Sequence, residues 1–368
     1  MSFTQFDRTN IFFKPLSSRK NKVRIREDHI PVIQEPKNTS QYFKSVISET
    51  ADRIRKAHEM KASVMLAMGA HTIKNGMAPT LIQLMEDGWL THLATNGAGI
   101  IHDWEFAFQG ESSEDVRANV TVGQFGIWEE TGKFINLALL IGAYEGKGYG
   151  ESVGSMIHHE GVSIPTTDEI AASLKSYEKD PDRAAAAIDL YAMMMKFSLK
   201  PGWMSIPFPC KDLCVQAAAY RLGIPFTGHP MIGHDIIYTH PLNHGGALGR
   251  VAIKDFLIYA QAVNNIDNGV YLSIGSAVMS PMIFEKSLSM AQNIHIQQKK
   301  HIDHHYMLIV DLASSAWDWQ KKGEPPPDDP AYYLRFLKTF NRMGGTMKYL
   351  SADNRDFLLA LYHELAKS

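Results

Sequence analysis

The fold is decided by residues 62–103, which read ASVMLAMGAHTIKNGMAPTLIQLMEDGWLTHLATNGAGIIHD. Two apolar runs, Ala62–Met68 and Trp89–Ala94, each break at a glycine-containing turn, and a segment with helical periodicity, Ala78–Asp87, joins them. This order is typical of a strand–helix–strand unit in a parallel sheet. In such a sheet both turns lie at the carboxyl ends of their strands, where backbone N–H groups can approach a nucleotide and helix N-termini favour anions.

Neither turn has the glycine spacing of a known nucleotide motif. The first runs from Gly69 to Gly76 and the second from Thr95 to Gly99, and neither matches G-x-G-x-x-G. From spacing alone, each turn can serve a nucleotide or simply pack the chain.

Strand and helix patterns alternate again from Lys211 to the end of the chain. We expect strands at Ala62–Met68, Trp89–Ala94, Ile224–Thr227, Val270–Ile274, Tyr306–Leu312 and Thr346–Leu350. Alternation of this kind implies right-handed crossovers with helices on both faces of a parallel sheet. The sequence therefore predicts an α/β fold: a doubly wound, Rossmann-like parallel sheet of about six strands in a three-layer α/β/α arrangement.

The composition along the chain divides it into two regions, a polar N-terminal arm and a longer remainder. Residues 1–40 are polar and proline-punctuated, which indicates an N-terminal arm that packs over the body or over a neighbouring subunit. No Pro/Gly/Ser linker divides the remainder, so residues 41–368 are expected to form a single domain. Within it, Gly146–Gly150 resembles a mobile glycine segment.

The overall composition favours a soluble globular protein. Of its 368 residues, 45% are hydrophobic and 21% charged, and the formal net charge of −2 gives no indication of a nucleic-acid groove. The basic run Arg19–Arg26 is expected to be a solvated arm or a subunit contact. Cys210 and Cys214 are expected to be reduced thiols. We find neither a signal peptide nor a membrane span, and we expect a cytoplasmic location.

The two turns, in this order, resemble those that hold NAD in the deoxyhypusine synthase family. Thr95–Asp103 matches the family's T-T-A-G-G-x-x-x-D turn, and His71–Gly76 is a looser match to its T-S-N-x-x-S-S-G turn. Four later segments keep the family's order, so that the resemblance covers roughly residues 45–365. These segments are Gly123–Trp128, Gly223–Asp235, Val270–Ser289 and Leu350–Asp353.

The resemblance implies an NAD site, a small cationic or amine-containing substrate and a homotetramer with sites at the subunit interface. Asp235 falls on the family's substrate-amine aspartate, and Asp353 falls on an aspartate that contacts NAD; an aspartate in either place could also cap a helix or turn. The residues that the resemblance assigns to NAD are Thr72, Asn75, Gly76, Thr95, Asn96, Gly97, Ala98, Gly99, Gly275, Ser276, Asp311, Ala313 and Asp353.

Two of the family's catalytic groups have no counterpart in this chain. The Trp-Gly-Lys motif is absent, since Lys338 and Lys348 lie in other contexts, and Met282 stands where the family has a histidine. A methionine cannot transfer protons, so deoxyhypusine synthase activity itself is not expected. We expect instead a related transferase or NAD-dependent enzyme that acts on a polyamine or another small amine. Lys74, in the first turn, could replace the missing nucleophile or face solvent.

Histidines near the expected strand ends offer another source of acid–base chemistry. His234 beside Asp235, and His102 beside Asp103, are the pairs we assign to catalysis, although a lone histidine is more often a hydrogen-bonded structural residue. The cluster His229–His244 also permits a second hypothesis, a metal-dependent hydrolase or isomerase, but its spacing is irregular and we assign no metal ligands. A third hypothesis is a nucleotide-binding paralogue without catalysis.

Overall fold

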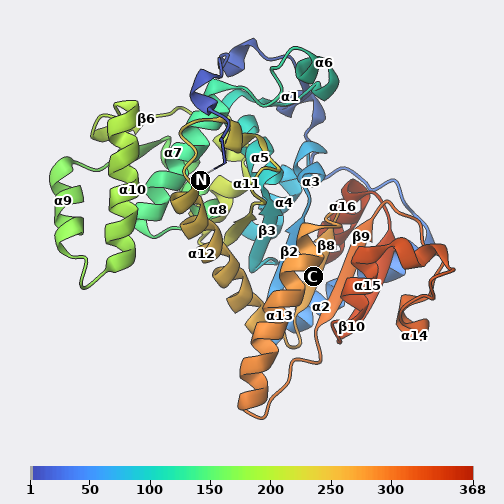
Figure 1. Ribbon diagram of the computed structural model, residues 1–368. Helices are drawn as coiled ribbons and strands as arrows, with labels where there is room; N and C mark the ends of the chain where they lie inside the picture. The colour runs from blue at the N-terminus through green and yellow to red at the C-terminus, as the bar shows by residue number, and fades with distance from the viewer. Residues whose placement is uncertain (1–2, 368) are drawn as a thin grey trace.

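Residues 3–367 are described by the computed structural model, and they are built around a six-stranded parallel sheet (Figure 1). The strand order is β10-β9-β8-β2-β3-β7, and every neighbouring pair is parallel. The strands are β2 (Val64–Met68), β3 (His92–Asn96), β7 (Phe226–His229), β8 (Val270–Ile274), β9 (Tyr306–Asp311) and β10 (Thr346–Ser351). The sheet with its flanking helices confirms the predicted three-layer α/β/α fold.

Alternate residues of each central strand point into two separate cores. Val64, Leu66 and Met68 belong to one hydrophobic cluster, and Met65 and Ala67 belong to the other. Every residue of β2 is buried, which is why this strand appears in the sequence as an uninterrupted apolar run. Layers of helices on both faces of the sheet follow directly from this burial.

Different helices supply the two cores. The first core takes in residues of α2 (Gln41–Glu59), α4 (Ala78–Glu86), α5 (Gly97–Gln109) and α16 (Asn354–Leu365). The second takes in residues of α12 (Gly245–Asn264), α13 (Met279–Gln297) and α15 (Arg335–Asn341). None of the helices within residues 3–367 is both long and apolar enough to cross a membrane.

The chain between β3 and β7 forms a helical lobe at one side of the sheet (Figure 1). Its helices after α5 are α6 (Val116–Thr121), α7 (Glu129–Glu145), α8 (Tyr149–His159), α9 (Thr167–Lys175), α10 (Pro181–Phe197) and α11 (Val215–Leu222). The segment Gly146–Gly150, predicted to be mobile, is the short connection from α7 to α8: Gly146 ends α7 at φ 75°, and Gly148 is the N-cap of α8.

Two short antiparallel sheets were not predicted. One pairs β1 (Asn21–Arg24) with β4 (Glu111–Glu114), and the other pairs β5 (Gly161–Ile164) with β6 (Gly202–Ser205). Their four-residue strands carry little apolar alternation, so the sequence pattern gave no signal for them. The remaining short helices are α1 (Ile25–Asp28), α3 (Ala70–Lys74) and α14 (Trp319–Lys322).

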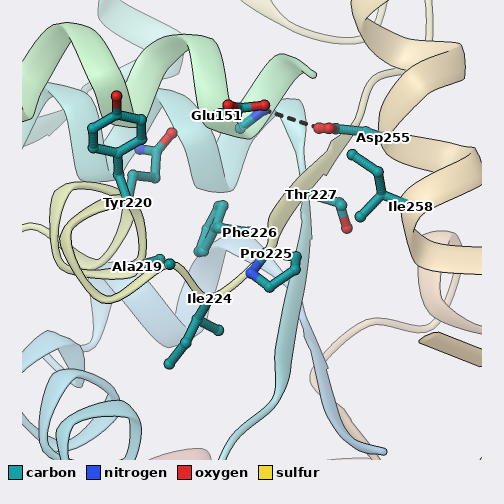
Figure 2. Close-up of a pocket in the computed structure, with 12 residues that line it drawn as sticks. Glu151, Ala219, Tyr220, Ile224, Pro225, Phe226, Thr227, Asp255 and Ile258 are labelled. Carbon is teal, nitrogen blue, oxygen red and sulfur yellow. Dashed lines mark hydrogen bonds between the residues drawn. The ribbon is translucent and has the colours of Figure 1, made fainter. Parts of the chain in front are cut away.

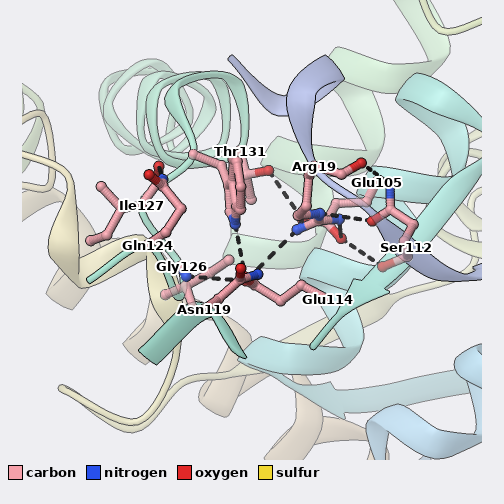
Figure 3. A network of polar contacts seen from close by, with 12 residues as sticks. Arg19, Glu105, Ser112, Glu114, Asn119, Gln124, Gly126, Ile127 and Thr131 are labelled. Carbon is pink, nitrogen blue, oxygen red and sulfur yellow. Dashed lines mark hydrogen bonds and ion pairs between the residues drawn. The ribbon is translucent and has the colours of Figure 1, made fainter. Parts of the chain in front are cut away.

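The N-terminal arm is fastened to the body by a buried arginine (Figure 3). Arg19 Nη1 and Nη2 donate to the two carboxylate oxygens of Glu105 on α5, at 2.8 and 2.5 Å. Glu114 Oε1 on β4 lies 4.0 Å from Arg19 Nη1. The hydroxyls of Ser112 and Thr131 donate hydrogen bonds to the Glu105 carboxylate. The basic run is therefore not uniformly solvated, because its first arginine is buried between carboxylates.

Candidate functional site

The sheet has one topological switch point, between β2 and β8. The chain runs outward from β2 through β3 to β7 on one side, and then from β8 through β9 to β10 on the other. Open α/β sheets bind ligands at the carboxyl ends of the strands beside such a point. Here the two strand ends touch: a Cβ at Gly69 would lie 2.1 Å from the carbonyl oxygen of Gly275, so only glycine fits at position 69.

A cavity of about 240 Å³ opens at these strand ends. It lies where β8, β9 and β10 end, beside α3 and the start of α16. Its lining residues are His71, Asn75, Gly275, Val310, Asp311, Leu312, Ala352, Asp353 and Asn354. Four of the residues that the family resemblance implied for the cofactor, Asn75, Gly275, Asp311 and Asp353, are thus brought together from four separate parts of the chain.

The two carboxylates of this cavity are held by their own local turns. Asp311 Oδ1 accepts a hydrogen bond from the backbone N–H of Ala313 at 3.0 Å. Asp353 is the N-cap of α16 and accepts from Arg355 N at 2.9 Å. The Arg355 guanidinium, 2.6 Å from Asp353 Oδ2, lowers the pKa of that carboxyl. Asp353 therefore combines the capping role considered above with a place in the cavity wall.

An amide pair joins the two helices at the cavity's rim. Asn75 Nδ2 on α3 donates to Asn354 Oδ1 on α16 at 3.0 Å, and Asn354 Nδ2 reaches Thr72 Oγ1 at 3.5 Å. Thr72 is fully buried and does not line the cavity. Gly76, at φ +79°, packs under the N-terminal segment instead, since its Cβ would lie 2.1 Å from the carbonyl oxygen of Asp28.

The second glycine turn holds the fold rather than lining the cavity. Asn96 caps α5 by accepting from Gly99 N at 3.0 Å, and Thr95 Oγ1 donates to the carbonyl of Met68 on β2 at 3.0 Å. A Cβ at Gly99 would lie 2.1 Å from Thr95 Oγ1, and one at Gly97 would lie 2.0 Å from Asp235 Oδ2. Ala98 is half-buried in the first turn of α5.

The other two assigned residues also lie at strand ends. Ser276 Oγ accepts from Ser280 N at 3.2 Å and so caps the first turn of α13. Ala313, just after β9, accepts a hydrogen bond at its carbonyl from the Tyr349 hydroxyl. Neither side chain lines the strand-end cavity.

Asp235 lies after β7, against the N-terminus of α5. Its Oδ1 accepts from Ile237 N at 3.1 Å, and burial raises the pKa of this carboxyl to about 6. Tyr149 and Tyr238 have hydroxyls without a hydrogen-bond partner among the described residues, and burial, followed by the nearby charge of Asp235, raises the pKa of both. Asp235 and these two tyrosines form a polar cluster next to the second turn.

The two histidine–aspartate pairs do not form acid–base dyads. His234 is exposed, whereas His102 lies inside α5 with Nδ1 2.7 Å from Ser112 Oγ, and burial lowers the pKa of His102 to about 4. Asp103 is fully buried and accepts from Val215 N, Gln216 N and Cys214 Sγ, which anchors α11 to α5. Neither His102 nor Asp103 lines the strand-end cavity.

Three of the four histidines of the 229–244 cluster have separate partners, and the fourth, His234, is exposed. His229 Nε2 lies 2.9 Å from Thr227 Oγ1, His240 Nδ1 accepts from Leu242 N, and His244 Nδ1 accepts from Ala247 N as the N-cap of α12. Within residues 3–367, no three His, Cys, Asp or Glu side chains converge as metal ligands. The arrangement thus gives no support to the hydrolase or isomerase hypothesis.

A second cavity, of about 230 Å³, lies beside the edge strand β7 and is bordered by α8, α11 and α12 (Figure 2). Asp255 of α12 is buried in its wall, and its Oδ2 accepts from Gly150 N at 2.9 Å and from Gly228 N at 2.6 Å. Burial raises the pKa of this carboxyl to about 7. Sequence reasoning missed Asp255, because a single aspartate in the middle of a helix has no distinguishing pattern.

No family model and no curated protein matches the chain. Among solved structures, unliganded AgrE aligns at 15% identity and TM-score 0.44, covering 90% of this chain. This chain spans only 34% of AgrE. A conserved putative LOR/SDH protein from Methanococcus maripaludis S2 aligns at 12% identity and TM-score 0.46, over 92% of this chain and 74% of that one.

A putative deoxyhypusine synthase from Entamoeba histolytica aligns at 11% identity and TM-score 0.44, over 89% of this chain and 90% of that one. Scores this low do not assign a function to this chain.

Proposed function

We propose that the chain is a deoxyhypusine synthase-like enzyme, a transferase or NAD-dependent enzyme that acts on a polyamine or another small amine. The observation that carries the proposal is the strand-end cavity beside the switch point. It gathers Asn75, Gly275, Asp311 and Asp353, which the family resemblance assigns to NAD.

The lining chemistry fits a nucleoside. Asp311 and Asp353 present carboxylate oxygens, the groups that accept hydrogen bonds from ribose hydroxyls in dinucleotide sites. A Cβ at Gly275 would meet nothing within 4 Å, so this glycine, at φ +56°, leaves open space for a ligand to approach the backbone. A bound nicotinamide ring would supply a hydride acceptor for the carbon next to an amine.

Asp235 is the group proposed to hold the substrate amine. A carboxylate buried enough to have its pKa raised gains from an ammonium partner, because the opposite charge offsets its desolvation.

Deoxyhypusine synthase activity itself is not proposed. Neither lysine near the family's motif position is free to act as a nucleophile: Lys338 Nζ lies 3.2 Å from Glu324, and Lys348 pairs with Glu49. Met282 on α13 offers no proton-transferring group in place of the family's histidine.

Calorimetric titration with NAD tests the cofactor site. Asp353→Ala should weaken NAD binding by about tenfold, the loss expected for one charge-assisted hydrogen bond. Asp180→Ala is the matched control, since Asp180 caps α10 by accepting from Arg183 N but does not line the cavity. Equal NAD affinity in the wild type and both variants, or no binding at millimolar NAD, would remove the proposed cofactor role.

Substrate and catalysis need a separate measurement. With NAD bound, a panel of polyamines should yield NADH absorbance, and Asp235→Asn should raise KM for the amine more than it lowers kcat. NAD binding without turnover of any amine would favour the non-catalytic paralogue. The homotetramer implied by the family resemblance can be tested by sedimentation of the full chain.

A further inference from the structure

A larger groove, of about 590 Å³, runs beside β10, the edge strand of the sheet. It is lined by residues of this strand, of the N-terminal end of α2 and of the segment around α14. Its lining residues are Asn38, Ser40, Tyr42, Phe43, Ser315, Trp317, Asp318, Trp319, Gln320, Lys321, Lys348, Tyr349, Leu350 and Ser351.

The groove adjoins the strand-end cavity along two strand ends. On β10, Leu350 and Ser351 line the groove, and the next two residues, Ala352 and Asp353, line the cavity. At the end of β9, Asp311 and Leu312 line the cavity, and Ser315 and Trp317 further along line the groove. The Tyr349 hydroxyl of β10 donates a hydrogen bond to the carbonyl of Ala313, which follows β9. This bond joins the two segments that separate the groove from the cavity.

The groove combines aromatic surface with an unneutralised cation. Tyr42 is 58% exposed, and Trp317 is held in place because its Nε1 donates to the Gly323 carbonyl at 2.8 Å. Lys348 is neutralised by Glu49, but Lys321 forms no ion pair with any residue in 3–367. Aromatic faces stack on nucleobases, and a lysine ammonium is a common phosphate partner.

We propose that this groove binds a nucleoside monophosphate, with the base against Trp317 and the phosphate beside Lys321. Lys322 Nζ lies 4.9 Å from the Trp317 ring centroid, which adds a second cation beside the indole. The inference rests on the proposed function, in which the groove receives the adenylate half of NAD. The strand-end cavity alone is smaller than the roughly 300–1,000 Å³ typical of ligand pockets, whereas the groove falls within that range.

The test titrates the full chain with AMP and, separately, with NAD, and follows calorimetric heat and tryptophan fluorescence. AMP should bind and quench fluorescence. Trp317→Ala and Lys321→Gln should each weaken both ligands about tenfold, as loss of one base stack or one charge-assisted contact predicts. Trp203→Ala, which removes a tryptophan 58% exposed on β6, and Lys300→Gln, which removes an exposed lysine, are the matched controls.

The outcomes separate the two proposals. If AMP does not bind, and if Trp317→Ala and Lys321→Gln leave NAD binding unchanged, the proposal that the groove binds a nucleoside monophosphate is overturned. The proposal that the strand-end cavity binds NAD would then still stand. AMP binding that both variants weaken, without NAD binding, supports the groove and overturns the NAD function. If neither ligand binds, both proposals fail. Lys321→Gln changes an exposed side chain, so its result stands even if Trp317→Ala disturbs α14.

Discussion

The two cavities have nearly equal volumes, about 240 and 230 Å³, and both have aspartates in their walls. They use these aspartates differently. Beside β7, Asp255 accepts backbone N–H groups from Gly150 and Gly228, so one side chain of α12 holds both the start of α8 and an edge strand. At the strand ends, Asp311 and Asp353 accept from residues two positions further along the chain.

The difference separates a carboxylate that joins elements distant in sequence from carboxylates that hold only their own turns. Removing Asp255 would disconnect elements that are distant in sequence, whereas removing Asp311 would disturb only its own turn. A buried carboxylate in a cavity wall is thus not sufficient evidence for a binding site, and the identity of its hydrogen-bond donors decides between the two roles.

The largest expected effect is on Asp255. Asp255→Ala leaves the buried N–H groups of Gly150 and Gly228 without acceptors and should lower the free energy of unfolding by about 3–5 kcal/mol. Asp311→Ala, the matched change in the other cavity, should cost less than about 1 kcal/mol. Urea unfolding of both variants measures the two changes in the free energy of unfolding. Similar losses would contradict the different roles of the aspartates in the two cavities.

The N-terminal arm is held by buried carboxylates that should behave like Asp255. Arg19→Met leaves Glu105 without its buried guanidinium partner, so we expect a loss of about 3 kcal/mol and faster proteolysis of the arm. Lys22→Met removes an exposed partner of Asp115 and should change stability by less than about 1 kcal/mol. Equal protease resistance of the two variants would contradict a structural role for Arg19.

The pH dependence of stability should distinguish Asp255 in a second way. Its pKa is about 7 in the folded chain, above the ordinary value of 3.8, so the folded state binds more protons than the unfolded state between these values. Relative to Asp255→Asn, the wild type should therefore lose stability as the pH rises from about 4 to about 7. The free energy of unfolding of both proteins is measured across this pH range. A difference between them that does not change with pH would refute the raised pKa of Asp255.

The smallest effects should come from two glycines whose Cβ positions are open. Gly249 lies in α12, and alanine there should add about 0.5–1 kcal/mol because it lowers the entropy of the unfolded chain. Gly275→Ala should instead cost about 1 kcal/mol, because its φ of +56° is unfavourable for alanine. Thermal unfolding compares the two variants, and Gly275→Ala should also weaken NAD binding, since its Cβ projects into the open space beside the cavity.

The six central strands could be predicted from the sequence, most clearly the inner ones such as Val270–Ile274, because both of their faces are covered and they read as apolar runs. The α5 helix could not be predicted, because the glycines that begin it look like a turn until Asn96 is seen to cap it. Asn75, Gly275, Asp311 and Asp353 were assigned to NAD through the order of family-like segments; their meeting in one cavity is observed, and their binding role stays a prediction. Asp255 was not identified, because its donor Gly150 is 105 residues away.

The strand order also has a consequence for how the chain folds. Contacts between β2 and β3 close a loop of 27 residues, whereas contacts between β3 and β7 close one of 134. The longer closure costs about 1.4 kcal/mol more in chain entropy. The strands β2 and β3 are close in sequence, and so are the strands β8, β9 and β10. We therefore expect each of these two groups to form first, and the two groups to pair afterwards through β2 and β8. The strand-end cavity is lined by residues that follow β2 and by residues at the ends of β8, β9 and β10. A ligand bound there would therefore oppose the separation of these two groups of strands and slow unfolding of the whole sheet.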